Sequence, residues 1–132
     1  MRFTYSNKTI IIALFLLILA LTACTGTKDA SAQTVELYYQ ALIEKDQDTL
    51  VNLSCAEHEA TALMTLDSFG NVDASLVDVA CQTIEEEGSR AIVTCDGAIS
   101  ATYDGEAREF PLTGQNYIVI QESGEWRMCG VE

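Results

Sequence analysis

The sequence predicts an α+β domain in which helices come first and a four-stranded antiparallel sheet follows. Between residues 33 and 66, apolar side chains recur at helical spacing. After Asn71 the pattern changes to the alternation that is typical of β-strands. Turn signals separate these β-rich stretches, so consecutive strands are expected to pair as an antiparallel meander.

An apolar leader precedes this domain. Residues 9–21 read TIIIALFLLILAL, and Arg2 and Lys8 are the only charged residues before Lys28. About a dozen apolar residues match the core of a secretory signal peptide and fall short of the roughly 20 that a transmembrane helix needs. The leader therefore predicts export, and an uncleaved membrane anchor is the alternative.

The leader ends in Leu21-Thr22-Ala23-Cys24. This stretch resembles the lipobox of bacterial lipoproteins, in which an aliphatic residue and two small residues precede a cysteine. The resemblance implies that Cys24 carries a diacylglycerol, with fatty acyl chains such as palmitate, and that the signal peptide is cut just before it. The protein would then be lipid-anchored in a cell membrane or outer membrane and would face outside the cytoplasm.

The expected organisation has three parts. Residues 1–23 are the lipoprotein signal peptide, residues 24–32 are a small, polar, lipidated tether, and residues 33–132 are one domain. The chain carries 20 Asp and Glu against 7 Lys and Arg, a formal net charge of −13. Such a surface repels nucleic acid and anionic headgroups, so no nucleic-acid partner is expected.

Helical periodicity predicts a first helix that ends near Lys45, and Ser31 is a suitable cap for its start. Residues 46–53 predict a short second helix. The face of the first helix that should meet the core is formed by Val35, Tyr38, Tyr39 and Leu42.

A third helix is predicted from a capping-box pattern. Ser54 is followed three residues later by Glu57, which is the usual arrangement at a helix start. The helix should run from about Cys55 to Leu66.

Four strands are predicted after Asn71. Asp104-Gly105 is a strong hairpin signal, and Pro111 lacks a donor for the sheet and so marks an edge or a bulge. In the first strand, Val77, Val79, Cys81 and Thr83 should share one face. The strands are expected at residues 75–84, 90–103, 108–121 and 126–131.

Besides Cys24 the chain has four cysteines, and in an exported protein these predict two disulfides. The predicted third helix is roughly 18 Å long, and a returning strand of similar length would bring Cys81 level with Cys55. This geometry favours the pairs Cys55–Cys81 and Cys95–Cys129. The alternative joins Cys81 to Cys95 across the turn at residues 85–89.

The order of elements, over roughly residues 31–131, resembles the NTF2-like or cystatin-like cone fold. Residues 35–53 (VELYYQALIEKDQDTLVNL) look like the family's opening helices, and residues 124–130 (GEWRMCG) are similar to its last strand. The resemblance implies N-terminal helices packed on a curved sheet. Since the family includes enzymes and binding domains, two functions are expected. One is a non-catalytic domain that binds a small apolar ligand or an envelope protein, and the alternative is an isomerase- or dehydratase-like enzyme that uses the cone pocket.

No motif for a catalytic, metal or cofactor site is found, so none of these is predicted. His58 is expected to be a solvated helix residue, and Asp78 and Asp96 should point to water. Alternation gives the concavity an apolar lining. Such a concavity suits a small apolar ligand, or it is simply filled by bulky side chains. The predicted lining residues are Tyr38 or Tyr39, Val77, Val79, Val93, Ile99 and Tyr103, and the aromatic residues expected in the core are Tyr38, Tyr39, Phe110, Tyr117 and Trp126.

Overall fold

The computed structural model describes residues 29–132, so the predictions for the leader and for Cys24 lie outside the described residues. Within this range, helices come first and an antiparallel sheet follows, as predicted. The helices are α2 (Ala30–Glu44), α3 (Gln47–Asn52) and α4 (Glu59–Phe69). The strands are β1 (Asp73–Glu87), β2 (Arg90–Tyr103), β3 (Glu106–Pro111), β4 (Asn116–Glu122) and β5 (Glu125–Val131).

The sheet has five strands in the order β1-β2-β4-β5, and β3 pairs with β2 beside this path. The prediction of four strands is wrong because its third strand is two strands. Pro111 ends β3, and a turn with Gly114 at positive φ leads into β4. As expected from Pro111, β3 lies at an edge, where it pairs with β2 alone.

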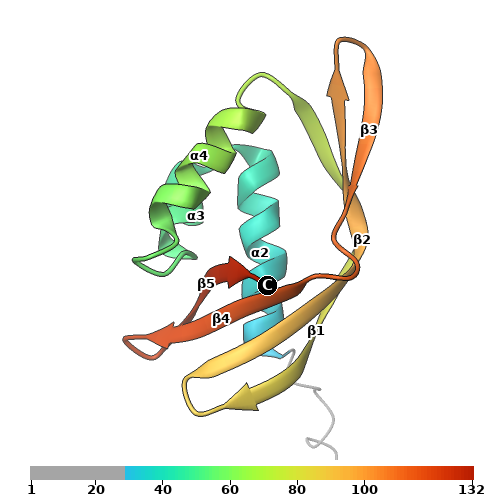
Figure 1. Cartoon of the computed structure of the whole chain (residues 1–132). Coiled ribbons are helices and arrows are strands. Elements are labelled where there is room, and N and C mark those ends of the chain that lie inside the picture. Colours follow the sequence, from blue (N-terminus) through green and yellow to red (C-terminus); the bar gives the residue numbers. More distant parts are fainter. Residues whose placement is uncertain (1–28) are drawn as a thin grey trace, which may run out of the picture.

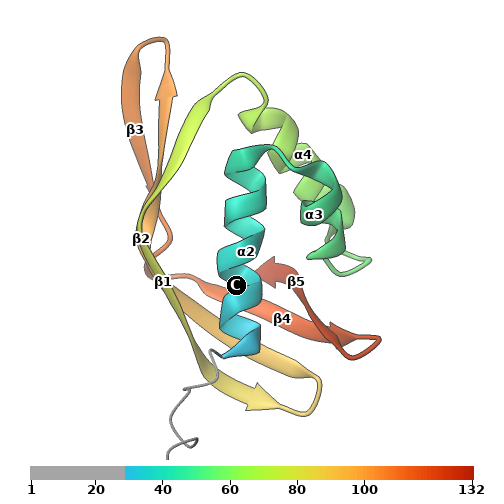
Figure 2. The same cartoon turned by 180° about the vertical axis from the view of Figure 1, so that it is seen from behind.

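The sheet curves strongly around α2, which lies against its concave side, with α3 and α4 beside it (Figure 1). Strand β3, residues 73–77 of β1 and residues 98–103 of β2 form a three-stranded extension, which we call the wing. Figure 2 shows that β1 and β2 run from the wing to a hairpin near the start of α2. No helix within residues 29–132 is long and apolar enough to cross a membrane.

The core lies between α2 and the concave face of the sheet. Tyr117 is fully buried, its hydroxyl donates to the carbonyl oxygen of Leu112 at 3.0 Å, and its ring meets that of Tyr39 edge-on at 5.7 Å between centroids. The other large side chains that are almost completely buried are Leu42, Leu50, Met128, Val35, Val93 and Val119. These side chains come from α2, α3 and three strands, so one continuous core joins both layers.

Helix starts follow tertiary contacts as well as local signals. The carboxylate of Asp46 accepts the backbone N–H of Thr49 at 3.1 Å and so caps α3, within the predicted segment. Ser31 does not cap α2. It lies one residue inside the helix, where its hydroxyl is 3.0 Å from Asp29 Oδ1 and 2.5 Å from the hydroxyl of Thr83 on β1.

Helix α4 begins at Glu59, four residues later than Cys55, so the capping-box prediction is wrong. Ser54 instead forms a parallel bridge with Met128 of β5. The backbone N–H of Cys55 donates to the carbonyl oxygen of Met128 at 2.8 Å, so this segment is held as an extension of the sheet.

The disulfides join Cys55 to Cys129 and Cys81 to Cys95. The favoured pairing of Cys55 with Cys81 and of Cys95 with Cys129 is therefore wrong, and the alternative pair Cys81–Cys95 is confirmed. Cys81 and Cys95 are direct partners in the β1–β2 register. Cys55 stays beside β5 because α4 starts after it, and this brings it to Cys129.

A β-bulge interrupts the predicted alternation of β1. The register shifts between Val77 and Ala80, and Asp78 has a φ of 51°. Opposite the bulge lies Gly97, where a Cβ atom would be 2.5 Å from the carbonyl oxygen of Val77. Val77 is consequently turned outward and is 36% exposed, whereas Leu76 and Val79 pack toward the core.

Candidate functional site

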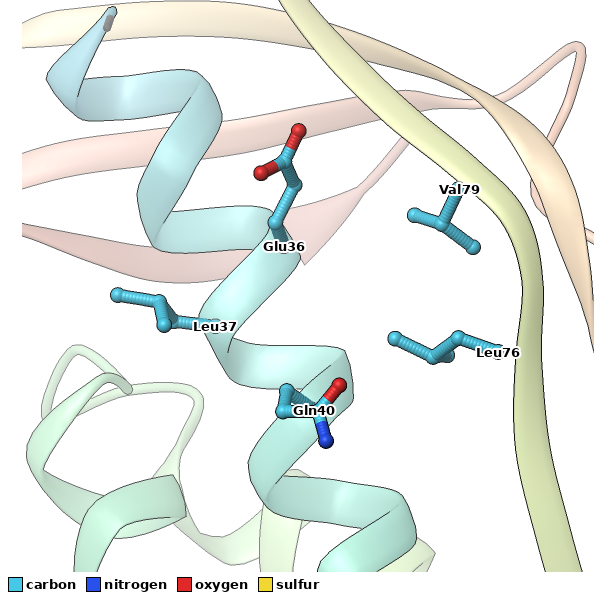
Figure 3. Close-up of a pocket in the computed structure, with 5 residues that line it drawn as sticks. All are labelled: Glu36, Leu37, Gln40, Leu76 and Val79. Atoms are coloured by element: carbon cyan, nitrogen blue, oxygen red, sulfur yellow. The ribbon is translucent and has the colours of Figure 1, made fainter.

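A groove of about 380 Å³ lies between helix α2 and strand β1. Glu36, Leu37 and Gln40 line it from the helix, and Leu76 and Val79 line it from the strand. Figure 3 shows that the side chains of Leu76 and Val79 point from the strand toward the helix. The bulge at Asp78 makes this lining, because it lets two side chains that are three residues apart face the same side.

The walls of the groove are mainly apolar, and its polar groups come from α2. Leu37 is 45% exposed although it is a large apolar side chain. Glu36 Oε1 accepts the backbone N–H of Cys81 at 3.0 Å, which fixes the carboxylate against the edge of β1. The side-chain amide of Gln40 donates to Glu44 at 2.5 Å. Such a groove suits an apolar group that also offers a hydrogen-bond donor.

A second cavity, of about 400 Å³, lies near the start of α2. Its polar groups include the side chains of Thr34, Asn52 and Glu125, but the Thr34 hydroxyl already donates to Ala30 O at 3.0 Å. Glu125 is engaged as well, because Arg127 Nη2 lies 2.9 Å from its carboxylate. The remaining lining residues are Ala30, Leu53, Gly124 and Trp126.

The predicted pocket residues do not gather around one cavity. Val79 lines the groove, as described above. Tyr38, Val93 and Ile99 are buried members of the core, so at these positions the concavity is filled by side chains. Tyr103 lies on the wing, where its ring meets the ring of Phe110 at 6.3 Å between centroids.

His58 is half-buried rather than solvated, so that expectation is wrong. Its Nε2 atom lies 3.1 Å from the hydroxyl of Tyr38. Burial lowers the pKa of His58 and raises the pKa of Tyr38 to about 12. Both groups are therefore neutral near pH 7, and the tautomer of His58 decides which of them donates. This pair lines neither of the two cavities described above.

Asp78 and Asp96 are exposed, as predicted. Within residues 29–132, no group of three or more His, Cys, Asp or Glu side chains could hold a metal ion. Of the aromatic residues expected in the core, Phe110 is the exception, because β3 lies beyond the helices and leaves it 42% exposed. Tyr38 and Tyr117 are buried, and Tyr39 and Trp126 pack against the core.

Sequence reasoning missed four of the five groove residues. Glu36, Leu37 and Gln40 lie off the apolar face of the predicted helix. Leu37 nevertheless indicated an apolar site on this side of the helix, because it is a large apolar residue on the polar face. Alternation in the sequence placed Val77, and not Leu76, on the same face as Val79. The bulge after Val77 changes this, so that Leu76 and Val79 face the same side, and Gly97 inside a strand was the signal for that bulge.

No protein-family model matches the chain, and no curated protein matches it in sequence. Solved structures do share its arrangement. A proposed ketosteroid isomerase from Shewanella frigidimarina is 14% identical with a TM-score of 0.55, over 80% of this chain and 95% of that chain. An NTF2-like protein with a cystatin-like fold from Novosphingobium aromaticivorans is 12% identical with a TM-score of 0.55, over 95% of this chain and 86% of that chain.

A SEC-C motif protein from Rhodopseudomonas palustris is also similar. It is 17% identical with a TM-score of 0.54, over 80% of this chain and 81% of that chain. Together these neighbours confirm the predicted NTF2-like α+β cone. At such identities they establish the fold alone, and the fold is shared by isomerases and by non-catalytic ligand-binding domains.

Proposed function

We propose that this protein is an exported lipoprotein, held at a cell membrane or outer membrane by acyl chains on Cys24. In this proposal its NTF2-like domain faces outside the cytoplasm and is a non-catalytic binding module. It takes a small apolar ligand or an apolar side chain of another envelope protein in the groove between α2 and β1.

The pairing of the cysteines is the observation that best supports export. The chain has five cysteines, and the four that lie within residues 29–132 all form disulfides. Disulfides persist in oxidising compartments outside the cytoplasm. Cys24 is the fifth cysteine, and its place at the end of an apolar leader suits lipidation rather than a third disulfide.

The anchor is tested by the substitution Cys24→Ser in the full chain. We expect the wild type to incorporate a labelled fatty acid and to fractionate with membranes, because two or more acyl chains anchor a protein stably. The Cys24→Ser protein should take up no label and should remain uncut or be released. Thr25→Ser is the matched control and should behave as the wild type. If Cys24→Ser is labelled and fractionates like the wild type, the protein is not a lipoprotein of this kind.

The groove is tested with Nile red, a neutral apolar dye. Leu37→Ser removes an exposed apolar wall and should weaken dye binding roughly fivefold, since it forfeits part of the transfer energy of a leucine side chain. Met64→Ser is the control, because Met64 is 67% exposed on α4 and does not line the groove. Equal dye binding by both variants would contradict the groove as the ligand site.

The second candidate function is a small isomerase or dehydratase, and the carboxylate of Glu36 in the groove is the observation that favours it. A carboxylate beside a bound apolar substrate could act as a general base. The substitution Glu36→Gln separates the two functions, because the amide oxygen can still accept the N–H of Cys81 but cannot take a proton. A binding module should keep its affinity for dye in this variant, whereas an enzyme should lose turnover.

A further inference from the structure

The second cavity, near the start of α2, has an aromatic side chain in its wall. Trp126 of β5 is on the strand face that meets the helices, because it lies two residues before the buried Met128 and packs against the core. Leu53 adds a further apolar side chain to the lining. The volume of about 400 Å³ is near the lower end of the range for small-molecule sites, about 300–1,000 Å³. A ligand of one or two rings matches this size.

The polar groups of this cavity carry no unpaired charge. The side-chain amide of Asn52, at the end of α3, makes no hydrogen bond within residues 29–132, so it is available to a ligand. The hydroxyl of Thr34 donates to Ala30 O at 3.0 Å and keeps its capacity to accept. Among the lining residues that the structure describes, Glu125 is the one carboxylate, and Arg127 Nη2 lies 2.9 Å from it.

Arg127 holds the polar edge of the cavity in a defined position. Its guanidinium donates to the carboxylate of Glu125 and also to the backbone carbonyl oxygen of Asn52. These two acceptors belong to different elements, β5 and α3, so the arginine connects the strand that carries Trp126 to the helix that carries the free amide. A site that is held in this way before the ligand arrives loses less entropy when the ligand binds.

A pyranose sugar matches this combination of groups. The C–H groups on the faces of its ring carry a slight positive charge, which the negative face of an indole attracts. The hydroxyl groups around its edge donate and accept hydrogen bonds, as the amide of Asn52 does. A wholly apolar ligand would cover that amide without pairing it, and an ion would find no unpaired counter-charge. We propose that this cavity binds the ring of a neutral sugar, which stacks on Trp126 and is hydrogen-bonded by Asn52.

The site suits binding rather than cleavage of the sugar. Glycoside hydrolysis normally uses two carboxyl groups that flank the bond to be broken, and this lining offers the single carboxylate of Glu125, which is paired with Arg127. The proposal goes beyond the proposed function and does not depend on it, because the cavity shares no lining residue with the groove between α2 and β1.

The test uses the fluorescence of Trp126, the single tryptophan of the chain. The purified full chain, in a detergent without a sugar headgroup, is titrated with glucose, N-acetylglucosamine, cellotetraose and chitotetraose. We expect a saturable change in tryptophan emission at millimolar concentrations of at least one sugar. Sorbitol, which has hydroxyl groups but no ring, is the control and should give no saturable change. Tighter binding of a tetramer than of its monomer would identify a glycan chain as the source of the ring, and equal binding would identify a free sugar.

Variants of the two main contacts complete the test. Asn52→Ala keeps the fluorescent reporter and should weaken binding about fivefold, because one hydrogen bond is lost. Asn71→Ala is the matched control, since Asn71 is also exposed but lies in the turn after α4 and does not line the cavity. Trp126→Leu, measured by calorimetry, should weaken binding about tenfold.

Non-reducing electrophoresis checks that both disulfides still form, and so that each variant folds. Three results would each overturn the proposal. They are the lack of a saturable change with any of the sugars, equal affinity of Asn52→Ala and Asn71→Ala, and full affinity in folded Trp126→Leu.

Discussion

The hydrogen bond between Tyr38 and His58 connects the stability of this protein to pH. Burial keeps Tyr38 protonated, and its hydroxyl shares a hydrogen bond of 3.1 Å with Nε2 of a neutral His58. His58 also occupies the N-terminal boundary of α4, where a positive charge is disfavoured by the helix dipole. Protonation of His58 would place a positive charge in a half-buried site at that helix end.

The folded protein should lose stability as the pH becomes acidic. Burial lowers the pKa of His58 in the folded protein below its usual value of 6.5. The stabilisation is therefore complete above about pH 6.5 and is lost as pH falls through the lowered pKa. His58→Gln keeps an acceptor but does not titrate, so the wild type should lose free energy of unfolding relative to this variant as pH drops from 7.5 to 5. Urea unfolding across this range measures it, and a pH-independent difference would contradict the prediction.

At the scale of elements, the two sheet edges beside the helices, those of β1 and β5, are both hydrogen-bonded to other parts of the chain. The carboxylates of Asp29 and Glu36 accept the backbone N–H groups of Thr83 and Cys81 at 3.1 and 3.0 Å, which occupies the free edge of β1. Burial alone would raise the pKa of Asp29, but its hydrogen bonds from Thr83 and Ser31 outweigh that effect and lower it. On the opposite edge, backbone bonds from the segment after α3 cover β5 at Met128. Edge strands that are covered in this way resist unwanted pairing with other chains.

The bulge in β1 is the element that decides which side chains reach the groove, and Gly97 permits it. Gly97 has a φ of 88°, and a Cβ atom there would lie 2.5 Å from the carbonyl oxygen of Val77 and 2.6 Å from that of Asp78. Alternation in the sequence could not predict this reversal, because one extra residue moves every following side chain to the other face.

The substitution Gly97→Ala should be strongly destabilising. The left-handed backbone costs about 1 kcal/mol for alanine, and overlap with two carbonyl oxygens adds about 1–3 kcal/mol. Gly105→Ala is a matched control, since Gly105 has a φ of 85° but no atom within 4 Å of the added Cβ. Chemical denaturation of both variants separates the two costs. Equal losses in the free energy of unfolding would show that the close approach at Gly97 has no energetic consequence.

At the scale of the whole molecule, local signals predicted the fold well and long-range contacts poorly. The second strand matches its predicted range, residues 90–103, because β-branched residues and the hairpin at Asp104-Gly105 define it locally. The start of α4, by contrast, depends on the contact of Ser54 with Met128, which is distant in the sequence. The disulfide prediction failed for the same reason, since it assumed that the helix begins at Cys55.

The candidate site was the least predictable part, because it lies between elements. Val79 was expected at the cavity, but the other expected residues fill the core or lie on the wing. Leu76 reaches the groove only because of the bulge, and Leu37 lines its α2 side although its side chain points away from Leu76 and Val79 (Figure 3). Periodicity describes which face of an element is apolar, and it does not describe how far apart two packed elements lie.

The two disulfides stabilise the molecule over different distances, and their removal should therefore have different effects. Cys55–Cys129 closes 74 residues and joins the helical segment to the last strand, whereas Cys81–Cys95 closes only 14 residues within one hairpin. In the chain-entropy model these loops correspond to about 4 and about 3 kcal/mol. Cys55 is also completely buried, so its replacement disturbs packing as well.

The double substitution Cys55→Ala with Cys129→Ala should consequently cost more free energy of unfolding than Cys81→Ala with Cys95→Ala. Urea unfolding followed by the fluorescence of Trp126, the single tryptophan of the chain, measures both variants. A larger loss from the hairpin pair would mean that closure of the long loop is not the main contribution of Cys55–Cys129.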